Sequence, residues 1–335
     1  MIIDCDRHVG VRQLADLLPF MPTGWRRHFE REEWLGATGL MSSHIRLDNH
    51  FQYAVPAEPL SSDAQSLRLP YQALTVAGWA DHVAGRAFVA AINQYGLDHW
   101  VTPDDRVVLA VSPHDPEWSA TEIRRHAATT GIGGVALPLT STMLGSRQWD
   151  PIYQACVETN LPLVVHFSGV EGNYAGAPAL SGGVHQSAFA RLALMPHVAE
   201  SNIASLAFEG AFARFPDLRI LFSGFGFTWL PSLLWRMDRE WRTFRHDVPW
   251  VTAPPSQWVA TNLWFTTWPL GEAAGREHWE GGFADALRTR IVFGSHAPHA
   301  NDDLAEAERL LGADWAKALT TNGAALLGLT TAEAR

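Results

Sequence analysis

The sequence predicts an α/β protein, specifically a (β/α)₈ TIM barrel with a capping insertion after strand 1. Eight short runs of apolar and β-branched residues alternate with longer stretches of helical periodicity, a pattern typical of βαβ units on a parallel sheet. Eight such units close into a barrel. The length of 335 residues suits one domain of this kind, because α/β barrels exceed the usual domain size. A doubly wound open sheet is the alternative.

The expected strands are Met1–Cys5, Tyr71–Val76, Arg106–Ser112, Gly134–Leu139, Leu161–Phe167, Leu218–Ser223, Leu263–Trp268 and Ile291–Ser295. The expected helices are Trp79–His99, Pro116–Thr129, Trp149–Thr159, Leu230–Phe244 and Leu304–Leu311. Residues 10–69 show neither the strand nor the helix periodicity, and they carry polar and proline-rich patches. We therefore expect this segment to cap the barrel mouth. Because no linker or repeat divides the chain, one domain is expected over residues 1–335. The segment Gly169–Gly183, rich in Gly, Ala and Ser, is expected to act as a lid.

Composition limits the classes of partner. The formal net charge is −10 and the basic residues are scattered, which argues against a nucleic-acid binder. No apolar run approaches a membrane span and the first residues lack a secretion signal, so we expect no membrane partner and a soluble, cytoplasmic protein. Cys5 and Cys156 form no CxxC motif and are expected to be reduced core residues. The 15 Trp and 15 His favour a pocket for a small-molecule substrate.

Four polar side chains collect where strands end. Asp6 and His8 lie two residues apart, so in a strand both point to one face; a solvated strand end is the alternative. His166 follows the apolar run LPLVV, where a core histidine bonded to a carbonyl is the alternative. His296 ends the eighth strand, which adjoins the first in a closed barrel. Together these residues predict a divalent metal site, with Zn²⁺ first and Mn²⁺ or Fe as alternatives.

The motifs around these residues also carry a family resemblance. They are MIIDCDRHV, LPLVVHFSG, FEGAFARFPDLRILFSGFGFTWLPSLLWRMDREW, FGSHAPHAN and NGAALLGL. The chain resembles the amidohydrolase-related family of the amidohydrolase superfamily, in its aminocarboxymuconate-semialdehyde decarboxylase-like branch. The resemblance covers nearly the whole chain and implies a (β/α)₈ barrel.

Two positions depart from the family pattern. The eighth-strand motif is usually G-S-D-x-P-H, and its Asp, a metal ligand and proton carrier, is His296 here. The sixth-strand position that often holds His or Glu falls at Gly224 when the segments are aligned on Trp229. Either His296 replaces the Asp as ligand or base, or the metal chemistry has been altered or lost. If metal is retained, His166 and His296 are the expected catalytic residues, with His296 moving protons.

Three classes of function stay open at this point. We expect a metal-dependent enzyme that hydrolyses an amide or lactone of a small organic substrate. The first alternative is non-oxidative decarboxylation of an aromatic or unsaturated acid, which the resemblance favours and the absence of a polar group at Gly224 disfavours. The second alternative is a metal-free enzyme or a non-catalytic small-molecule binder, since fold does not secure function. The resemblance and the Trp content favour a homodimer.

Three further residues are candidates for binding the substrate. Arg46, in the inserted segment, could bind a carboxylate in a bidentate way; a surface salt bridge is the alternative. Glu209, in FEGAF, either contacts the site or caps local backbone. His299 follows Pro298 and is expected to orient His296 or the loop around it.

Overall fold

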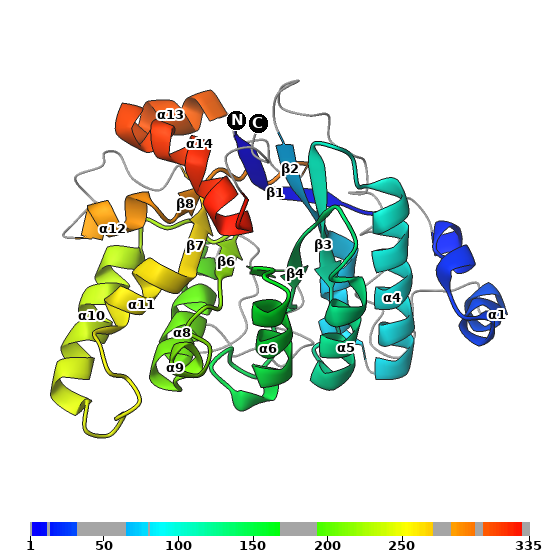
Figure 1. Ribbon diagram of the computed structural model, residues 1–335, viewed down its shortest axis with the longest axis horizontal. Coiled ribbons are helices and arrows are strands. Elements are labelled where there is room, and N and C mark those ends of the chain that lie inside the picture. Colours follow the sequence, from blue (N-terminus) through cyan, green and yellow to red (C-terminus); the bar gives the residue numbers. More distant parts are fainter. Residues whose placement is uncertain are drawn as a thin grey trace.

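The computed structural model describes residues 2–11, 14–31, 65–79, 81–167, 193–270, 283–298 and 304–329. Eight parallel strands follow one another around a single sheet in chain order (Figure 1). They are β1 (Ile3–Val9), β2 (Gln65–Pro70), β3 (Asp105–Ala110), β4 (Ile132–Ala136), β5 (Leu163–His166), β6 (Ile220–Ser223), β7 (Leu263–Thr266) and β8 (Ile291–Val292). The predicted α/β class is therefore confirmed.

The sheet closes because the segment that contains β8 returns to β1. The Cys5 amide donates to the Phe293 carbonyl at 2.8 Å, and the His8 amide donates to the Ala297 carbonyl at 2.8 Å. In the other direction the His296 amide donates to the Asp6 carbonyl at 2.9 Å. These bonds make a nearly closed (β/α)₈ barrel, so the open doubly wound alternative is wrong.

Helices cover the outside of the barrel, and α4, α5, α6, α8 and α10 follow one another along the strands in Figure 1. The longer helices are α1 (Thr23–Arg31), α4 (His82–His99), α5 (Pro116–His126), α6 (Asp150–Glu158), α8 (Met195–Phe208), α10 (Leu230–Phe244), α11 (Pro255–Asn262), α13 (Leu304–Leu311) and α14 (Ala313–Leu327). The shorter elements are α3 (Tyr71–Leu74), α9 (Ala211–Arg214), α12 (Ala284–Arg288), η1 (Leu14–Asp16), η2 (Leu18–Phe20), η3 (Thr75–Gly78) and η4 (Arg147–Trp149). Asp81 caps the first turn of α4 by accepting from two of its amides, as capping carboxylates commonly do.

The predicted second strand is wrong. Tyr71–Val76 forms α3 and the first half of η3, and β2 is the preceding segment Gln65–Pro70. β2 lacks the apolar run by which strands were recognised in the sequence. Only Leu67 and Leu69 are apolar before its final proline, and the polar side chains of Ser66 and Arg68 bond to Asp105. The inserted segment consequently ends before residue 65. Its residues 14–31 form η1, η2 and α1, residues 32–64 lie outside the described residues, and its capping role stays a prediction.

Two layers of apolar residues surround the strands. One cluster draws members from every strand and so fills the barrel interior, as expected for a TIM barrel. It contains Ile3, Cys5, Leu67, Leu69, Val108, Ala136, Val164, Leu221, Trp264 and Val292. The intervening residues of β5 to β8, such as Val165 and Phe222, belong to a larger cluster that also includes residues of α6, α8, α10 and α14. This alternation puts residues two apart on one face, which matters for the polar groups described below.

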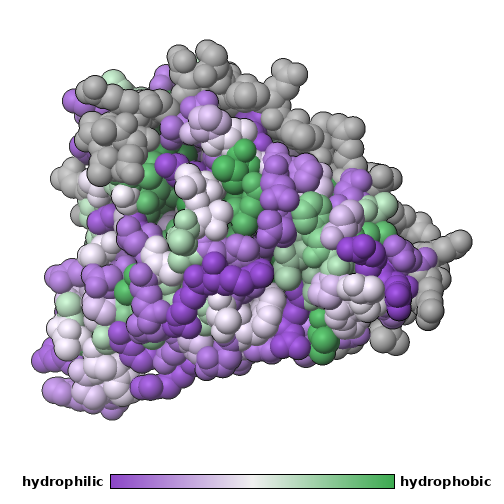
Figure 2. Space-filling view, turned by 45° about the vertical axis from the view of Figure 1, so that its right-hand side comes forward, coloured by the Kyte–Doolittle hydropathy of each residue, from purple (hydrophilic) through white to green (hydrophobic). Residues whose placement is uncertain are grey.

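The two cysteines agree with the expectation from composition. Cys5 and Cys156 are both free and buried. Hydrophilic side chains make up most of the face drawn in Figure 2, with apolar residues in patches between them. Within the described part of the chain, no helix is both long and apolar enough to cross a membrane.

Candidate metal centre

A bulge in β1 accompanies the first pair of predicted ligands. Asp4 pairs with Ser66 of β2, whereas Arg7, three residues later, pairs with Arg68, only two residues later. One extra residue therefore lies in β1 between these pairs, and bulges of this kind re-aim side chains near active sites. Asp6 lies within the bulged stretch and is fully buried.

Asp4 anchors this stretch to the loop after β8. Its carboxylate accepts from the Ser295 amide at 3.0 Å and from the Ser295 hydroxyl at 2.7 Å. It also accepts from the Asp6 amide at 3.2 Å. Asp4 was missed in the sequence, although its place two residues before Asp6 in DCDRH is the signal that could have identified it. We conclude that Asp4 positions both Asp6 and the residue after Ser295, which is His296.

His166 is presented with a defined ring orientation at the end of β5. Its Nδ1 donates to the carbonyl of Phe167, which leaves the Nε2 lone pair free for other use. Nε2 lies 3.2 Å from His8 Nε2 and 3.5 Å from Asp6 Oδ1. A ring held through one nitrogen while the other faces a cluster of donors is the usual arrangement of a metal-binding histidine. A core histidine bonded to a carbonyl would explain the hydrogen bond of Nδ1, but it would not explain why Nε2 faces His8 and Asp6.

His296 occupies an unusual backbone position after β8. Its φ angle is 57°, in the left-handed region that few residues other than glycine adopt, and such positions cluster at functional sites. Nδ1 lies 3.1 Å from Asp6 Oδ2. The ring stacks flat on Trp268, with 3.5 Å between ring centroids and 6° between planes. Gly294 permits this approach of β8 to β1, because a Cβ there would lie 2.7 Å from Asp6 Cβ.

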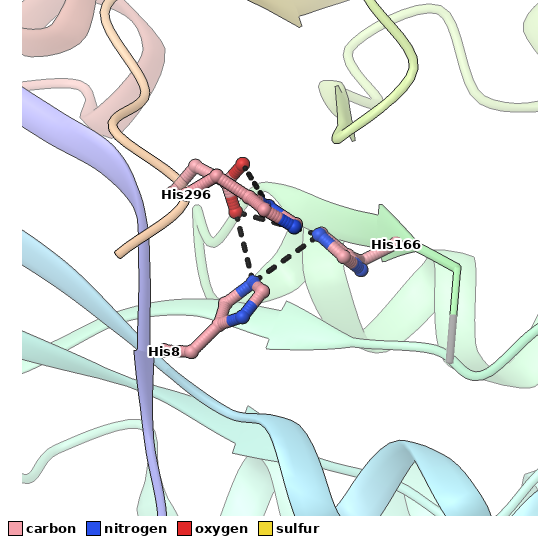
Figure 3. A group of neighbouring side chains, drawn as sticks. His8, His166 and His296 are labelled. Atoms are coloured by element: carbon pink, nitrogen blue, oxygen red, sulfur yellow. Dashed lines mark hydrogen bonds and ion pairs between the residues drawn. The ribbon is translucent and has the colours of Figure 1, made fainter. Parts of the chain in front are cut away.

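The four predicted ligands thus converge, and Figure 3 shows the three histidines of the group facing one another. One potential donor atom from each of Asp6, His8, His166 and His296 lies within 4.8 Å of the others, and all four residues are buried. Two ligands on a tetrahedral Zn²⁺ at its usual bond lengths lie about 3.3–3.6 Å apart. The pairs at 3.2 and 3.5 Å given above match this spacing, and the widest pair would close by about 1 Å around a bound ion. The donor set of three imidazoles and one carboxylate also fits a divalent transition metal.

Electrostatics support the same interpretation. Burial alone would raise the pKa of the Asp6 carboxyl, but His296, His166 and the hydrogen bond with His8 hold its pKa well below the ordinary value. Burial lowers the pKa of His8 and lowers that of His166 further, against the opposing effect of Asp6. The carboxylate is therefore ionised and these two rings are neutral, which are the protonation states that metal binding requires.

The glycine directly after β6, Gly224, is explained by the space that His166 occupies. Gly224 has a φ angle of 84°, and a Cβ there would lie 2.7 Å from His166 Nε2. Its amide donates to Thr266 Oγ1 at 3.0 Å. A His or Glu at this position would therefore collide with the present His166 ring. The departure at Gly224 and the position of His166 belong together.

The structure does not bring every predicted residue to this cluster. Glu209 is exposed at the end of α8, where Ser205 Oγ donates to its carboxylate at 2.6 Å and Arg214 Nη1 donates to its carbonyl at 2.8 Å. Since α8 leads into the start of β6, Glu209 lies near the opposite end of the barrel from His166. This arrangement corresponds to the alternative given above, in which Glu209 caps local backbone. Arg46, His299 and the segment Gly169–Gly183 lie outside the described residues.

Aromatic side chains around the imidazoles were not predicted. Tyr71 stacks on His8, with 4.8 Å between ring centroids, and Phe167 stacks on His166 at 4.5 Å. With Trp268 on His296, each of these three histidines has an aromatic neighbour. Tyr71 and Phe167 directly follow a strand, and Trp268 comes two residues after one. Position after a strand, rather than aromatic content, is the signal that could have identified them.

Fold and site together define a metal-dependent enzyme built on a (β/α)₈ barrel. The family model described as Amidohydrolase matches residues 3–334, so the chain belongs to this amidohydrolase family, as its motifs predicted.

Solved structures agree on the fold. An amidohydrolase from Mycobacterium avium subsp. paratuberculosis K-10 superposes with a TM-score of 0.70 at 19% identity, covering 99% of this chain and 98% of that one. A 5-carboxyvanillate decarboxylase from Novosphingobium aromaticivorans, with bound manganese and 3-methoxy-4-hydroxy-5-nitrobenzoic acid, gives 0.69 at 16% identity, covering 98% and 97%. A 2,6-dihydroxybenzoate decarboxylase from Rhizobium gives 0.59 at 16% identity, covering 98% of each chain.

Proposed function

We propose that this enzyme is a non-oxidative decarboxylase of a small aromatic carboxylic acid. The observation that carries the proposal is the charge of the donor set. With one carboxylate and three imidazoles, a bound divalent ion would leave a charge of about +1, whereas a second carboxylate would neutralise it. A buried positive centre attracts an anionic group such as a substrate carboxylate. Decarboxylases of aromatic acids among the similar structures support the same substrate class.

The residues of this chain have distinct tasks in such a reaction. Asp6, His8, His166 and His296 would hold the metal, which when bound supplies a Lewis acid for the substrate oxygens. In decarboxylation the bond between the ring carbon and the carboxylate breaks, CO₂ leaves, and the ring carbon must receive a proton. We assign this transfer to the proton on His296 Nδ1, which lies 3.1 Å from the Asp6 carboxylate, and the ring would regain a proton from solvent after each turnover. Stacking on Trp268 keeps the imidazole plane fixed during transfer.

We further propose Zn²⁺ as the resident ion. Imidazole suits Zn²⁺, while carboxylate and water ligands suit Mn²⁺, which is bound in some of the similar decarboxylases. His296 in place of the aspartate shifts the set towards nitrogen. Competitive dialysis against equal Zn²⁺ and Mn²⁺ should load Zn²⁺ into the parent, and His296→Asp should increase the Mn²⁺ share. Equal preferences in the two proteins would contradict this assignment.

The test of the reaction is release of CO₂. Metal-loaded protein is incubated with 5-carboxyvanillate and a set of dihydroxybenzoates, and headspace CO₂ and the ultraviolet spectrum are followed. We expect CO₂ from at least one acid and none after His296→Asn. Glu122→Gln, a change in a buried carboxylate outside the cluster, serves as the control and should remain active.

Hydrolysis of an amide or lactone is the second candidate. The observation in its favour is Gly224, because the sixth strand offers no side chain at the position where the family often carries a polar group. Acid release from lactones and amides in a pH-stat, with no CO₂ from any acid, would establish this candidate instead. Protein that takes up no Zn²⁺ or Mn²⁺ would return the question to metal-free chemistry or ligand binding.

A further inference from the structure

Ser223, the last residue of β6, lies beside the cluster but has no task in the function proposed above. It is the Cα partner of His166 across the parallel ladder between β5 and β6. Paired residues of neighbouring strands point to the same face of the sheet. The Ser223 side chain therefore points to the inner face, on the side of the His166 ring, at the same level of the barrel.

The hydroxyl of Ser223 is buried without a partner. Its Oγ atom is inaccessible to solvent and makes no hydrogen bond within the described part of the chain. The hydroxyls at the end of β7 and directly after it have partners: Thr266 Oγ1 accepts from the Gly224 amide at 3.0 Å, and Thr267 Oγ1 accepts from the Gly294 amide at 3.1 Å. Buried hydroxyls are almost always bonded, so this one calls for an explanation such as a bound ligand.

Gly224 has no side chain that could compete with Ser223 for the space beside the His166 ring. Because a Cβ at residue 224 would lie 2.7 Å from His166 Nε2, no side chain extends from that position towards the cluster. Ser223 is then the last residue of β6 whose polar side chain faces the His166 side. His166 Nδ1 is already engaged by the Phe167 carbonyl, so it does not serve the serine.

We propose that Ser223 is a substrate-binding residue whose hydroxyl donates a hydrogen bond to a carboxylate oxygen of the bound acid. This inference rests on the proposed function, since it assumes a carboxylate at the cluster. In this arrangement Ser223 supplies a polar side chain one residue before Gly224, the position at which the family often carries His or Glu.

The experiment titrates benzoate into Zn²⁺-loaded protein by calorimetry and compares the parent with Ser223→Ala. Loss of one hydrogen bond to a charged acceptor should weaken benzoate binding about tenfold while the Zn²⁺ content is unchanged. The metal-free Ser223→Ala protein should melt at the same temperature as the parent or higher, because an unpartnered hydroxyl is removed. Ser119→Ala is the matched control. Its buried hydroxyl donates to the Ser112 carbonyl at 2.8 Å, so this change should lower the melting temperature and leave benzoate binding intact.

Three results would overturn the proposal: benzoate affinity within twofold of the parent, a melting temperature that falls as in Ser119→Ala, or a parent that binds no benzoate. Failure of the proposed function is seen separately in the CO₂ assay. If the parent binds benzoate but decarboxylates no acid, the reaction proposed above is wrong, and the Ser223 comparison still decides the role of the serine.

Discussion

Two buried carboxylates of this protein lie beside histidines, but they differ in the charges that surround them. Glu122, on α5, lies 3.1 Å from His126 Nε2 and 2.7 Å from Arg125 Nη2. Asp6 lies beside His8, His166 and His296, and no arginine or lysine is among its partners in the part of the chain that the structure describes. The guanidinium of Arg125 balances the negative charge of Glu122, whereas imidazole nitrogens of three histidines surround Asp6.

The difference shows which feature identifies a metal centre. An acid next to a histidine occurs in both places, and the pKa of both carboxyl groups is lowered. A buried negative charge is costly unless a positive charge balances it, and Arg125 supplies that balance for Glu122. At Asp6 a mobile cation would supply it, because burial keeps His8 and His166 neutral. The variants below should therefore separate the two clusters.

The largest effect is expected from removing a donor of the Asp6 cluster. His166→Ala deletes the Nε2 atom that faces Asp6 and His8. Metal content by elemental analysis should fall from about one ion per chain to near zero, since loss of a ligand exceeds the ~10–100-fold cost of changing its supporting groups. Glu122→Gln should keep the parent's metal content. Equal metal loss in both variants would mean that the two clusters do not differ in function.

Crowding the cluster without changing a donor should have a smaller effect. Gly224→Ala places a Cβ 2.7 Å from His166 Nε2 at a φ angle of 84°. We expect Zn²⁺ affinity, measured against a chelator, to fall about 10–100-fold, as it typically does when the residues that orient a metal ligand are changed. Gly24→Ala in α1 is the control, because a Cβ there meets nothing within 4 Å. Unchanged affinity in Gly224→Ala would show that His166 can retreat without cost.

Acidification should destabilise the metal-free protein through the Asp6 cluster. The pKa values of His8 and His166 are lowered in the folded state, so the unfolded chain binds protons first as pH falls below about 6.5. Asp6 acts in the same direction below about pH 4, because its folded pKa is also lowered. The free energy of unfolding should decline from neutral pH downwards, and His166→Phe should reduce the slope near pH 6. A slope that is identical in the two proteins would contradict the assigned protonation state of His166.

The sequence predicted the site better than it predicted one of the strands. Asp6, His8, His166 and His296 could be recognised because strand alternation and the order of motifs are local signals. The β1 bulge, which accompanies Asp6 and His8, depends on pairing with a distant strand. β2 was misplaced because its polar side chains bond to Asp105.

The groups that sequence reasoning missed act through contacts between distant segments. Asp4 and Ser295 are 291 residues apart, and no periodicity in either segment indicates that they are bonded. The steric requirement at Gly224 arises from His166, on the preceding strand. In the sequence the glycine indicated a lost polar group, whereas in three dimensions it makes room for a donor.

The smallest effect is expected at Glu122. Glu122→Gln removes a charge that Arg125 and His126 contact, and Arg125 is 56% exposed, so solvent and salt screen the pair. We expect a loss of about 1 kcal/mol in the free energy of unfolding at pH 7 and low salt. Because the pKa of Glu122 is lowered in the fold, its charge stabilises above the unfolded value of about 4.3, and this contribution disappears as pH falls through the folded value. Parent and variant should therefore converge in acid. A difference that persists there would mean that Glu122 contributes through packing rather than charge, and the contrast with Asp6 would then rest on metal content alone.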